Sequence, residues 1–379
     1  MIDDLDTMSL EWLRSKPGIK WARAREGELA AWVADMDYPI PQVVSRAISD
    51  VLASGDLGYP DLRDGPRLAR PFVDRMSARH GLALSPDRVR EFDDVLNAIQ
   101  AVLHVSVPSG GRVAIHTPTY PPFLDTITTM GYVMEPIPYR RHSGRWEFDV
   151  EAASVTVARS HALILVNPHN PTGRVLAVDE LRPLVTAAQA TGTLLIADEV
   201  HADLVYSPHR HVALAGLEPQ SVTVTSATKA FNLAGIRCAV AHIGSDDVWE
   251  RLQSRPHHLF GAVSNVSVAA TAAAWSREGD AWLDNVRGIL ERNRRRVTDR
   301  MPAPLEVIEP EATYLAWIDT CSALGDDPAD EIRKRTGVIL TSGNDFGPEG
   351  HGFVRLNFAT SGDIVDEILD RISQSFGRG

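Results

Sequence analysis

Cysteine is scarce in this chain of 379 residues, which contains only Cys238 and Cys321. Two cysteines this far apart cannot build the disulfide framework of a small secreted domain, and they lack the close spacing of metal-ligating cysteines. Their scarcity excludes a disulfide-stapled fold and gives no support to a metal centre. We therefore expect a protein of the reducing cytoplasm, with no metal site.

Long apolar runs and basic clusters are also missing. No stretch approaches the roughly 18 consecutive apolar residues that span a membrane, and the acidic, interrupted segment 1–14 lacks the pattern of a signal peptide. The chain has 38 basic and 50 acidic residues, a formal net charge of −12, and no stripe of Lys and Arg to meet phosphates. We expect neither a membrane nor a nucleic acid as partner.

The chain does have the composition of a large globular protein. Hydrophobic residues make up 44% of it, and its length suffices for a large domain with a smaller one beside it. Several runs are nearly all apolar rather than alternating, and helix-length segments separate most of them: residues 112–117, 162–166, 194–197, 221–225 and 238–243. This pattern is typical of an α/β fold, a mostly parallel sheet with helices on both faces.

Apolar residues at helical spacing predict helices over residues 41–53, 66–80 and 95–105, and a long helix from 266 to about 301. Residues 1–40 show no regular pattern, whereas 313–318 and 353–358 have the pattern of half-buried strands. We expect residues 46–280 to form the large domain. The N-terminal segment 1–45 is expected to join residues 281–379 in a smaller α+β domain.

Lysine is the scarcest charged residue, and the chain has only Lys16, Lys20, Lys229 and Lys334. Lys229 alone follows a strand run, Ser221–Thr225. A lysine there either reaches solvent as an ordinary cation or stays buried, where burial lowers its pKa and leaves a reactive amine. Its neighbours decide between these two interpretations.

Polar side chains follow the other predicted strands in the same way. Tyr120, Asn170 and Asp198 each stand at or just beyond the carboxyl end of a separate strand, as Lys229 does. Open α/β sheets bind ligands in the crevice outside those ends. We therefore expect the four residues to converge in one site, which favours the buried amine.

Arg355 lies inside the apolar strand run 353–358. A buried guanidinium needs a carboxylate partner, because an uncompensated charge is costly to bury. The partner is either a structural Asp or Glu of the chain or the carboxylate of a bound substrate, held by two parallel hydrogen bonds.

These residue types suit pyridoxal phosphate. Asp198 would keep the pyridine nitrogen protonated and make the ring an electron sink, Asn170 would donate to the phenolic oxygen, and Tyr120 would stack on the ring. Lys229 would form the Schiff base and, once freed by a substrate amine, would remove the substrate Cα proton. Hydroxyl and guanidinium groups spaced around the lysine would hold the phosphate: Ser226, Thr228 and Arg237.

With these residues in place, the chain resembles a known family across almost its full length. The resemblance rests on four motifs: Asn170–Gly173, Asp198, Ser226–Lys229 followed by Arg237, and Arg355. They identify the fold-type I pyridoxal-phosphate enzymes of the aspartate aminotransferase superfamily. The resemblance implies a homodimer in which Tyr59 reaches the cofactor phosphate of the partner subunit. It also implies that Val95 and Leu96, at a helix start, face that phosphate.

Within the superfamily the chain is most similar to the bacterial cystathionine β-lyase branch. The similarity lies in five segments: Trp32–Tyr38, Asn167–Gly173, Asp198–His201, Lys229–Gly235 and Pro310–Trp317. His201 stands where many aminotransferases carry a tyrosine, and it is expected at the cofactor. Asp37 and Tyr38, together with Arg355, are expected at the substrate, a small amino acid.

The resemblance implies a carbon–sulfur lyase that cleaves L-cystathionine or related cysteine S-conjugates to pyruvate, ammonia and a thiol. An aminotransferase that needs a 2-oxo acid is the alternative, and both reactions use Lys229, Asp198 and Arg355. The choice between them depends on how the substrate is oriented. A lesser alternative is a regulatory protein that binds a partner on the same scaffold, which the intact Lys229 and Asp198 disfavour.

Overall fold

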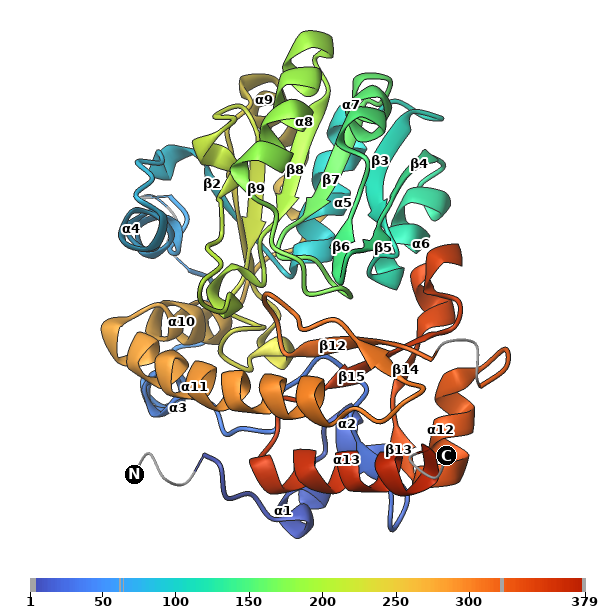
Figure 1. Ribbon diagram of the computed structural model, residues 1–379. Helices are drawn as coiled ribbons and strands as arrows, with labels where there is room; N and C mark the ends of the chain where they lie inside the picture. The colour runs from blue at the N-terminus through green and yellow to red at the C-terminus, as the bar shows by residue number, and fades with distance from the viewer. Residues whose placement is uncertain (1–4, 61–62, 64, 321–323, 377–379) are drawn as a thin grey trace.

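The computed structural model describes residues 5–60, 63, 65–320 and 324–376. Cys321 lies outside these ranges, whereas Cys238 is buried with a free thiol. Figure 1 shows an upper part built around the largest sheet and a lower part that contains the four-stranded sheet, the β1-β13 pair and both ends of the chain.

The large sheet, counted over the described residues, has seven strands in the order β2-β10-β9-β8-β7-β3-β4. Its strands are β2 (Val89–Phe92), β3 (Arg112–Thr117), β4 (Val133–Pro138), β7 (Ala162–Val166), β8 (Leu194–Asp198), β9 (Val222–Thr225) and β10 (Ala239–Ile243). All pairs from β4 to β9 are parallel, whereas β10 is antiparallel to both β9 and β2. The predicted mostly parallel sheet is confirmed.

Helices cover both faces of this sheet, as the nearly all-apolar strands predict (Figure 1). On β7, Ile164 packs in the core beneath α5 (Val95–Ser106), α6 (Pro121–Thr129) and α9 (Asp246–Gln253). Its neighbours Leu163 and Leu165 pack in the opposite core, beneath α7 (Val150–Ala158) and α8 (Val178–Thr191). Because successive strand residues point to opposite faces, both faces need apolar side chains.

The lower part is built around an antiparallel sheet in the order β11-β12-β15-β14. Its strands are β11 (Glu306–Val307), β12 (Leu315–Asp319), β14 (Thr341–Ser342) and β15 (Phe353–Asn357). Three helices of the C-terminal part share one core with it: α11 (Arg277–Arg300), α12 (Pro328–Thr336) and α13 (Gly362–Phe376).

The N-terminal segment belongs to this lower part. It forms α1 (Leu10–Ser15), α2 (Ile19–Ala22) and β1 (Leu29–Ala30), so the described part of this segment, residues 5–40, is more regular than we predicted. Strand β1 pairs in parallel with β13 (Val338–Ile339). The amide N–H of Asn357 also donates to Ala31 O at 2.9 Å. The exact domain boundaries stay a prediction.

The predicted long helix over 266–301 is wrong, because the chain forms α10 (Asn265–Ala274) and then α11. The Ser276 side chain caps α11 by accepting a hydrogen bond from Gly279 N at 3.2 Å. A Cβ at Gly279 would lie 2.1 Å from Ala274 O. The glycine therefore allows α11 to begin directly against the end of α10.

Shorter elements connect these parts. Helices α3 (Gln42–Ala53) and α4 (Ala69–His80) follow the N-terminal segment, and β5 (Arg140–His142) pairs with β6 (Arg145–Glu147). The 3₁₀ helices are η1 (Pro86–Arg88), η2 (Ala202–Leu204), η3 (Leu214–Gly216), η4 (Ala234–Ile236), η5 (His257–Phe260), η6 (Gly343–Phe346) and η7 (Pro348–Gly350). Among the described helices, none has both the length and the apolar character needed to span a bilayer.

Candidate active site

Lys229 follows β9, and its amine is held inside the protein. Its Nζ donates a hydrogen bond to the main-chain oxygen of Ala34 at 2.9 Å. Burial lowers the pKa of Lys229, Arg355 lowers it further, and Asp35 and Asp198 oppose the shift. The surroundings of the amine thus favour its neutral form, in the direction that a reactive lysine requires.

Asp198 ends β8 and is almost fully buried. Its Oδ1 accepts a hydrogen bond from Val200 N at 3.1 Å. Burial is the main cause that raises the pKa of Asp198 to about 7. In the described part of the chain it forms no ion pair, so its carboxyl group can bind a cationic group of a ligand.

Arg355 lies on β15 with only 4% of its surface exposed. Its Nη1 donates to Asn170 Oδ1 at 2.9 Å and its Nη2 to Trp32 O at 3.3 Å. Its guanidinium also lies 5.0 Å from the ring centroid of Phe346. Burial lowers the pKa of Arg355 to about 10, so the group remains charged near neutral pH.

No carboxylate of the described residues pairs with Arg355. The sequence leaves two possible partners for this guanidinium, a structural acid or a substrate carboxylate. The described part of the structure shows no structural acid paired with Arg355, which agrees with a substrate carboxylate as the partner. The bond from Arg355 to Asn170 also shows that a residue predicted to bind substrate and one predicted to bind the cofactor are in direct contact. It leaves the amide N–H groups of Asn170 free to donate elsewhere.

Tyr120 and His201 lie close to this group. Tyr120 precedes α6 and packs edge-on against Phe123, with ring centroids 5.7 Å apart. Burial raises the pKa of Tyr120, and the charges of both Arg355 and Asp198 act on it. Burial, with the charges of Lys229 and Arg355, lowers the pKa of His201 to about 3, so its ring is neutral.

Of the residues predicted for the phosphate, Ser226 and Thr228 bond to each other, and Arg237 lies at the start of α5. Ser226 Oγ accepts from Thr228 N at 3.1 Å and donates to Cys238 O at 2.5 Å. Arg237 pairs with Asp94, the residue that caps α5. This ion pair places a guanidinium beside Val95 and Leu96, whose amide groups, in the first turn of a helix, have no partner within the helix and suit an anion.

Asp37 and Tyr38, predicted to bind substrate, have partners inside the fold instead. Asp37 pairs with Lys20 at 3.0 Å and accepts from Trp21 Nε1 at 2.7 Å. The Tyr38 hydroxyl donates to Thr360 O at 2.7 Å. Because these bonds occupy both side chains, the structure does not support a substrate contact for either residue.

The residues missed by sequence reasoning are Asp35, in the same N-terminal segment, and Tyr314, directly before β12. Asp35, two positions before Asp37, is the acid whose charge most opposes the pKa shift of Lys229. The Tyr314 hydroxyl donates at 2.8 Å to Ala34 O, the same oxygen that Lys229 contacts. The acidic and aromatic stretch 32–38 signals a role, but the sequence does not show which of its acids faces the amine.

Tyr59 lies between α3 and α4. Its side chain is fully exposed, at 102% of the reference surface. An aromatic residue so exposed is available to a second subunit, as the resemblance implies. Its role stays a prediction.

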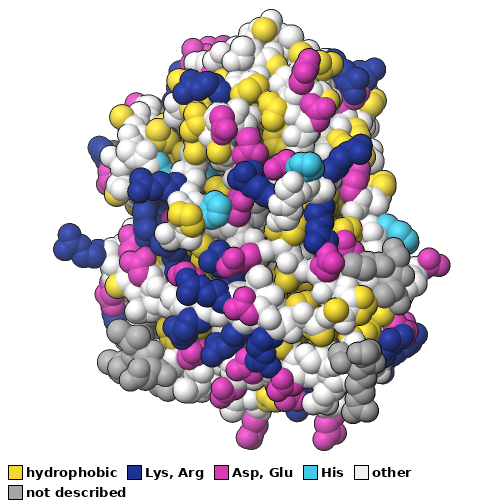
Figure 2. Space-filling view, viewed as in Figure 1, with side chains coloured by type: hydrophobic (Ala, Val, Ile, Leu, Met, Phe, Trp, Pro, Cys, Tyr) yellow, Lys and Arg dark blue, Asp and Glu magenta, His cyan; other side chains and the backbone are white. Residues whose placement is uncertain are grey.

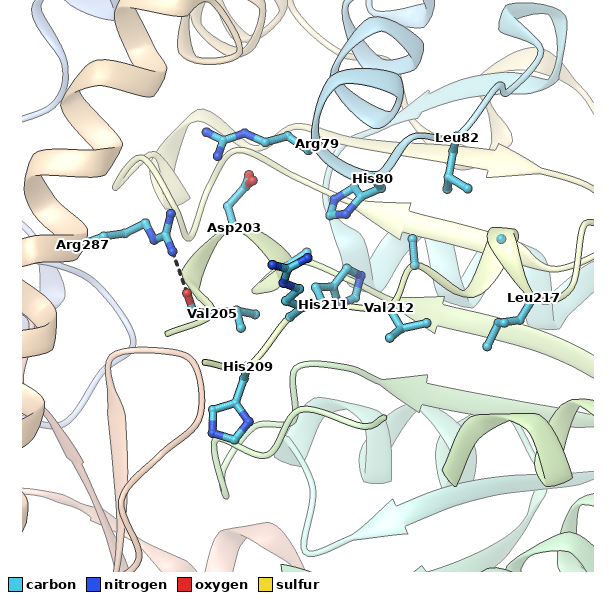
Figure 3. A pocket seen from close by; sticks show the side chains of 14 residues that line it. Arg79, His80, Leu82, Asp203, Val205, His209, His211, Val212, Leu217 and Arg287 are labelled. Atoms are coloured by element: carbon cyan, nitrogen blue, oxygen red, sulfur yellow. Dashed lines mark hydrogen bonds between the residues drawn. The ribbon is translucent and has the colours of Figure 1, made fainter. Parts of the chain in front are cut away.

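A separate cleft of about 590 Å³ is lined by residues of α4, α11 and the segment 202–217 (Figure 3). None of the sequence-predicted site residues lines it. His211, on its wall, lies 3.2 Å from the buried carboxylate of Glu199, which also accepts from Leu214 N at 2.8 Å. Glu199, the neighbour of Asp198, thus holds the 209–214 loop and has a structural role.

The site fits pyridoxal phosphate. It offers a buried amine, an acid without an ion-pair partner in the described residues, an amide with free donors and a cationic helix start: Lys229, Asp198, Asn170 and Arg237 with Val95. These are the groups needed for the carbonyl, the pyridine nitrogen, the phenolic oxygen and the phosphate of that cofactor. The fold and this site define the fold-type I class of aminotransferase-like proteins.

The chain belongs to the aminotransferase class I and II family, whose model matches residues 33–372. The cystathionine β-lyase of Corynebacterium glutamicum is 30% identical over 381 residues, which cover 96% of this chain and 98% of that protein. The cystathionine β-lyase PatB of Bacillus subtilis (strain 168) is 29% identical over 376 residues, or 93% of this chain and 95% of that one. The structure of the pyridoxal-phosphate-bound C–S lyase of Staphylococcus hominis matches with a TM-score of 0.90 at 27% identity, covering 99% of both chains.

Proposed function

We propose that this protein is a pyridoxal-phosphate-dependent carbon–sulfur β-lyase that cleaves L-cystathionine or related cysteine S-conjugates to pyruvate, ammonia and a thiol. The observation that carries the proposal is the buried Arg355 guanidinium. It has no acidic partner within the described residues, it donates to Asn170, and its charge acts on Lys229. Relatives named as cystathionine β-lyases support the lyase over an aminotransferase.

The chain's own residues would hold the cofactor at both ends. Asp198 would bind the pyridine nitrogen, and Asn170 the phenolic oxygen, through its free amide N–H. The phosphate would be bound by the start of α5 and by a hydroxyl and guanidinium set: Ser226, Thr228 and Arg237. When bound, pyridoxal phosphate supplies the electron sink that makes the substrate Cα proton acidic.

Arg355 would bind the substrate carboxylate through two parallel hydrogen bonds, which orients the amino acid in the site. Lys229, whose pKa burial lowers, would supply the amine that takes the Cα proton. The same amine can then give a proton to the departing sulfur. Tyr314 and Lys229 both donate to Ala34 O, which positions the amine against the N-terminal segment.

The proposal includes a homodimer that takes a small amino-acid substrate in the cytoplasm. The fully exposed Tyr59 supports the dimer, because the resemblance places this residue at the partner's cofactor phosphate. Scarce cysteine supports a reducing compartment.

The purified protein, loaded with pyridoxal phosphate, tests the reaction. We expect pyruvate and a thiol from L-cystathionine in the absence of any 2-oxo acid. A coupled lactate dehydrogenase assay measures the pyruvate, and a thiol reagent measures the second product. If L-cystathionine gives neither product, and amino acids are consumed only when a 2-oxo acid is added, the protein is an aminotransferase and the lyase proposal is wrong.

A further inference from the structure

The main-chain oxygen of Ala34 accepts two side-chain hydrogen bonds. One comes from Lys229 Nζ at 2.9 Å, and the other comes from the Tyr314 hydroxyl at 2.8 Å. A carbonyl oxygen has two lone pairs, so it can accept both bonds at the same time. Ala34 and Tyr314 are both buried. Tyr314 therefore bonds to the same atom as the amine that is proposed to take the substrate proton.

The backbone directly before Tyr314 has an unusual conformation. Thr313 has a φ of 71°, in the left-handed region that β-branched residues rarely adopt. Two bonds hold it there: Thr313 N donates to Leu204 O at 3.0 Å, and the Tyr206 hydroxyl donates to Thr313 O at 2.6 Å. Strained backbone of this kind persists only where its surroundings determine it, and it is concentrated at functional sites. The conformation of Thr313 sets the direction in which the Tyr314 side chain leaves the main chain.

The turn that contains Ala34 is held on both sides by one buried side chain. Asn357 Nδ2 donates to Val33 O at 2.6 Å and to Asp35 O at 2.7 Å, the carbonyl groups before and after that of Ala34. Asp35 N also donates to Val33 O at 2.9 Å, which makes the turn tight. Asn357 thus fixes the neighbouring carbonyl groups and leaves the oxygen of Ala34 itself to the two donors that share it.

The Tyr314 hydroxyl is a donor that stays protonated near neutral pH. Burial raises the pKa of Tyr314 well above its usual value, Asp35 raises it further, and Arg355 lowers it. The Tyr314 ring lies edge-on to His201, with ring centroids 6.2 Å apart. Tyr314 therefore belongs to the Lys229 site, where it supplies a hydrogen bond rather than a proton.

We propose that Tyr314 is a positioning residue, whose hydroxyl fixes the Ala34 oxygen as the acceptor for the free Lys229 amine. An amine that donates to a fixed oxygen holds one position, and its lone pair remains available for the proton that it takes. The inference rests on the proposed function, because it names the residue that directs the amine toward the substrate Cα proton. The aminotransferase alternative uses the same amine, so the positioning role does not depend on which of the two reactions follows.

Tyr314→Phe keeps the ring and removes the hydroxyl. With L-cystathionine we expect kcat to fall about tenfold and KM to change by less than about twofold, because the amine is misplaced whereas Arg355 is unchanged. Tyr132→Phe is the matched control, since the Tyr132 hydroxyl also donates to a main-chain oxygen, that of Leu103 at 3.1 Å. Its kcat should equal that of wild type. An unchanged kcat in Tyr314→Phe, or an effect on KM alone, would refute the positioning role.

Crystal structures of the cofactor-free protein measure the position of the amine without any turnover. In wild type we expect Lys229 Nζ within hydrogen-bond distance of Ala34 O. In Tyr314→Phe we expect Nζ to leave this oxygen or to occupy more than one position. If the amine keeps a single, fully occupied position on Ala34 O in the variant, the hydroxyl does not fix it and the inference is wrong.

Exchange of the Cα proton separates this inference from the lyase proposal. L-alanine has no sulfur to lose, so NMR in D₂O measures the removal of its Cα proton by the cofactor-loaded protein without elimination or an added 2-oxo acid. We expect Tyr314→Phe to slow this exchange about tenfold and Tyr132→Phe to leave it unchanged. If exchange slows in this way although wild type forms no pyruvate from L-cystathionine, the positioning role stands and the lyase proposal fails. Equal exchange rates in wild type and Tyr314→Phe would overturn the positioning role, whatever the product.

Discussion

At the scale of single residues, burial rather than charge pairing sets the chemistry. Asp198 and Arg355 are both buried, and burial shifts both pKa values toward the neutral form, to about 7 and about 10. Neither group has an ion-pair partner in the described residues, so burying them lowers the free energy of unfolding. The fold accepts this loss of stability at the site whose chemistry requires the shifted pKa values. The sequence alone can locate such residues on strands, but it cannot show that structural partners are missing.

The loss of stability caused by burying an unpaired carboxylate leads to a prediction for Asp198. Its folded pKa of about 7 lies above the value of 3.8 for a free carboxyl group, so the native cofactor-free protein binds the proton more tightly than the unfolded chain. Stability therefore falls as the pH rises from about 4 to about 7 and is then constant. Asp198→Asn cannot ionise, and we expect it to be more stable than wild type at pH 8 by on the order of 2–4 kcal/mol.

Urea unfolding of the cofactor-free protein at pH 5 and pH 8 measures this difference. The stabilisation by Asp198→Asn should be clearly smaller at pH 5, where the wild-type carboxyl group is mostly protonated. The same variant should lose at least about 99% of turnover when loaded with cofactor, because an amide cannot hold the pyridine nitrogen protonated. An equal stability difference at both pH values would contradict the shifted pKa.

At the scale of elements, the sequence predicts the central strands well and the edge strands poorly. The runs at 112–117 and 162–166 coincide with β3 and β7, because a strand buried on both faces must be apolar throughout. The edge strands β2 and β4 are not apolar throughout. β2 contains Arg90 and Glu91, and β4 contains Pro136 and Pro138, which a central strand does not tolerate. The periodicity of apolar residues also fails to predict the break between α10 and α11, because the break depends on a single close approach at Gly279.

The N-terminal segment is the element that completes the site, and Asn232 attaches it to the Lys229 loop. Asn232 Oδ1 accepts from Met36 N at 3.0 Å, and its Nδ2 donates to Tyr38 O at 2.7 Å. Asn232 also has a φ of 58°, in the left-handed region that few residues other than glycine and asparagine adopt. These two bonds position Ala34 over Lys229. The motif Lys229–Gly235 signals this loop, but the long-range bonds to residues 36 and 38 are visible only in the fold.

We predict that two substitutions separate the side-chain bonds from the backbone conformation. Asn232→Gly keeps the backbone conformation but loses both bonds, which should lower the free energy of unfolding by about 1–3 kcal/mol. Asn232→Ala loses the same bonds and adds about 1 kcal/mol of strain at the positive φ. Urea unfolding should therefore rank wild type above the glycine variant and the glycine variant above the alanine variant. An alanine variant as stable as the glycine variant would show that the backbone there relaxes.

At the scale of the whole molecule, the monomer leaves one predicted site residue without a role. On the face shown in Figure 2, basic and acidic side chains are interspersed, and neither kind forms a broad patch that would steer a charged partner. The sequence predicts the large sheet, the Lys229 group and the position of Arg355 on a buried strand. It gives Tyr59 a function only through a second copy of the chain, and the exposure of Tyr59 agrees with such a role.

A mixture of two inactive variants tests this arrangement. Tyr59→Ala should lose most cofactor retention and activity, because each site lacks the partner's hydroxyl, and Lys229→Ala should lose activity because each site lacks its amine. If Tyr59 acts across the interface, a hybrid dimer contains one site with both residues, since the Lys229→Ala chain supplies Tyr59 to the Tyr59→Ala chain. Dissociating and reassociating the two proteins in equal amounts should restore about a quarter of wild-type activity, the statistical yield for a twofold dimer.

Size-exclusion chromatography with light scattering measures whether the protein is a dimer. Two different affinity tags, one on each variant, allow the hybrid dimer to be purified in two affinity steps. If the isolated hybrid is inactive, Tyr59 does not serve the partner's site, and the subunit arrangement implied by the resemblance is wrong for this chain.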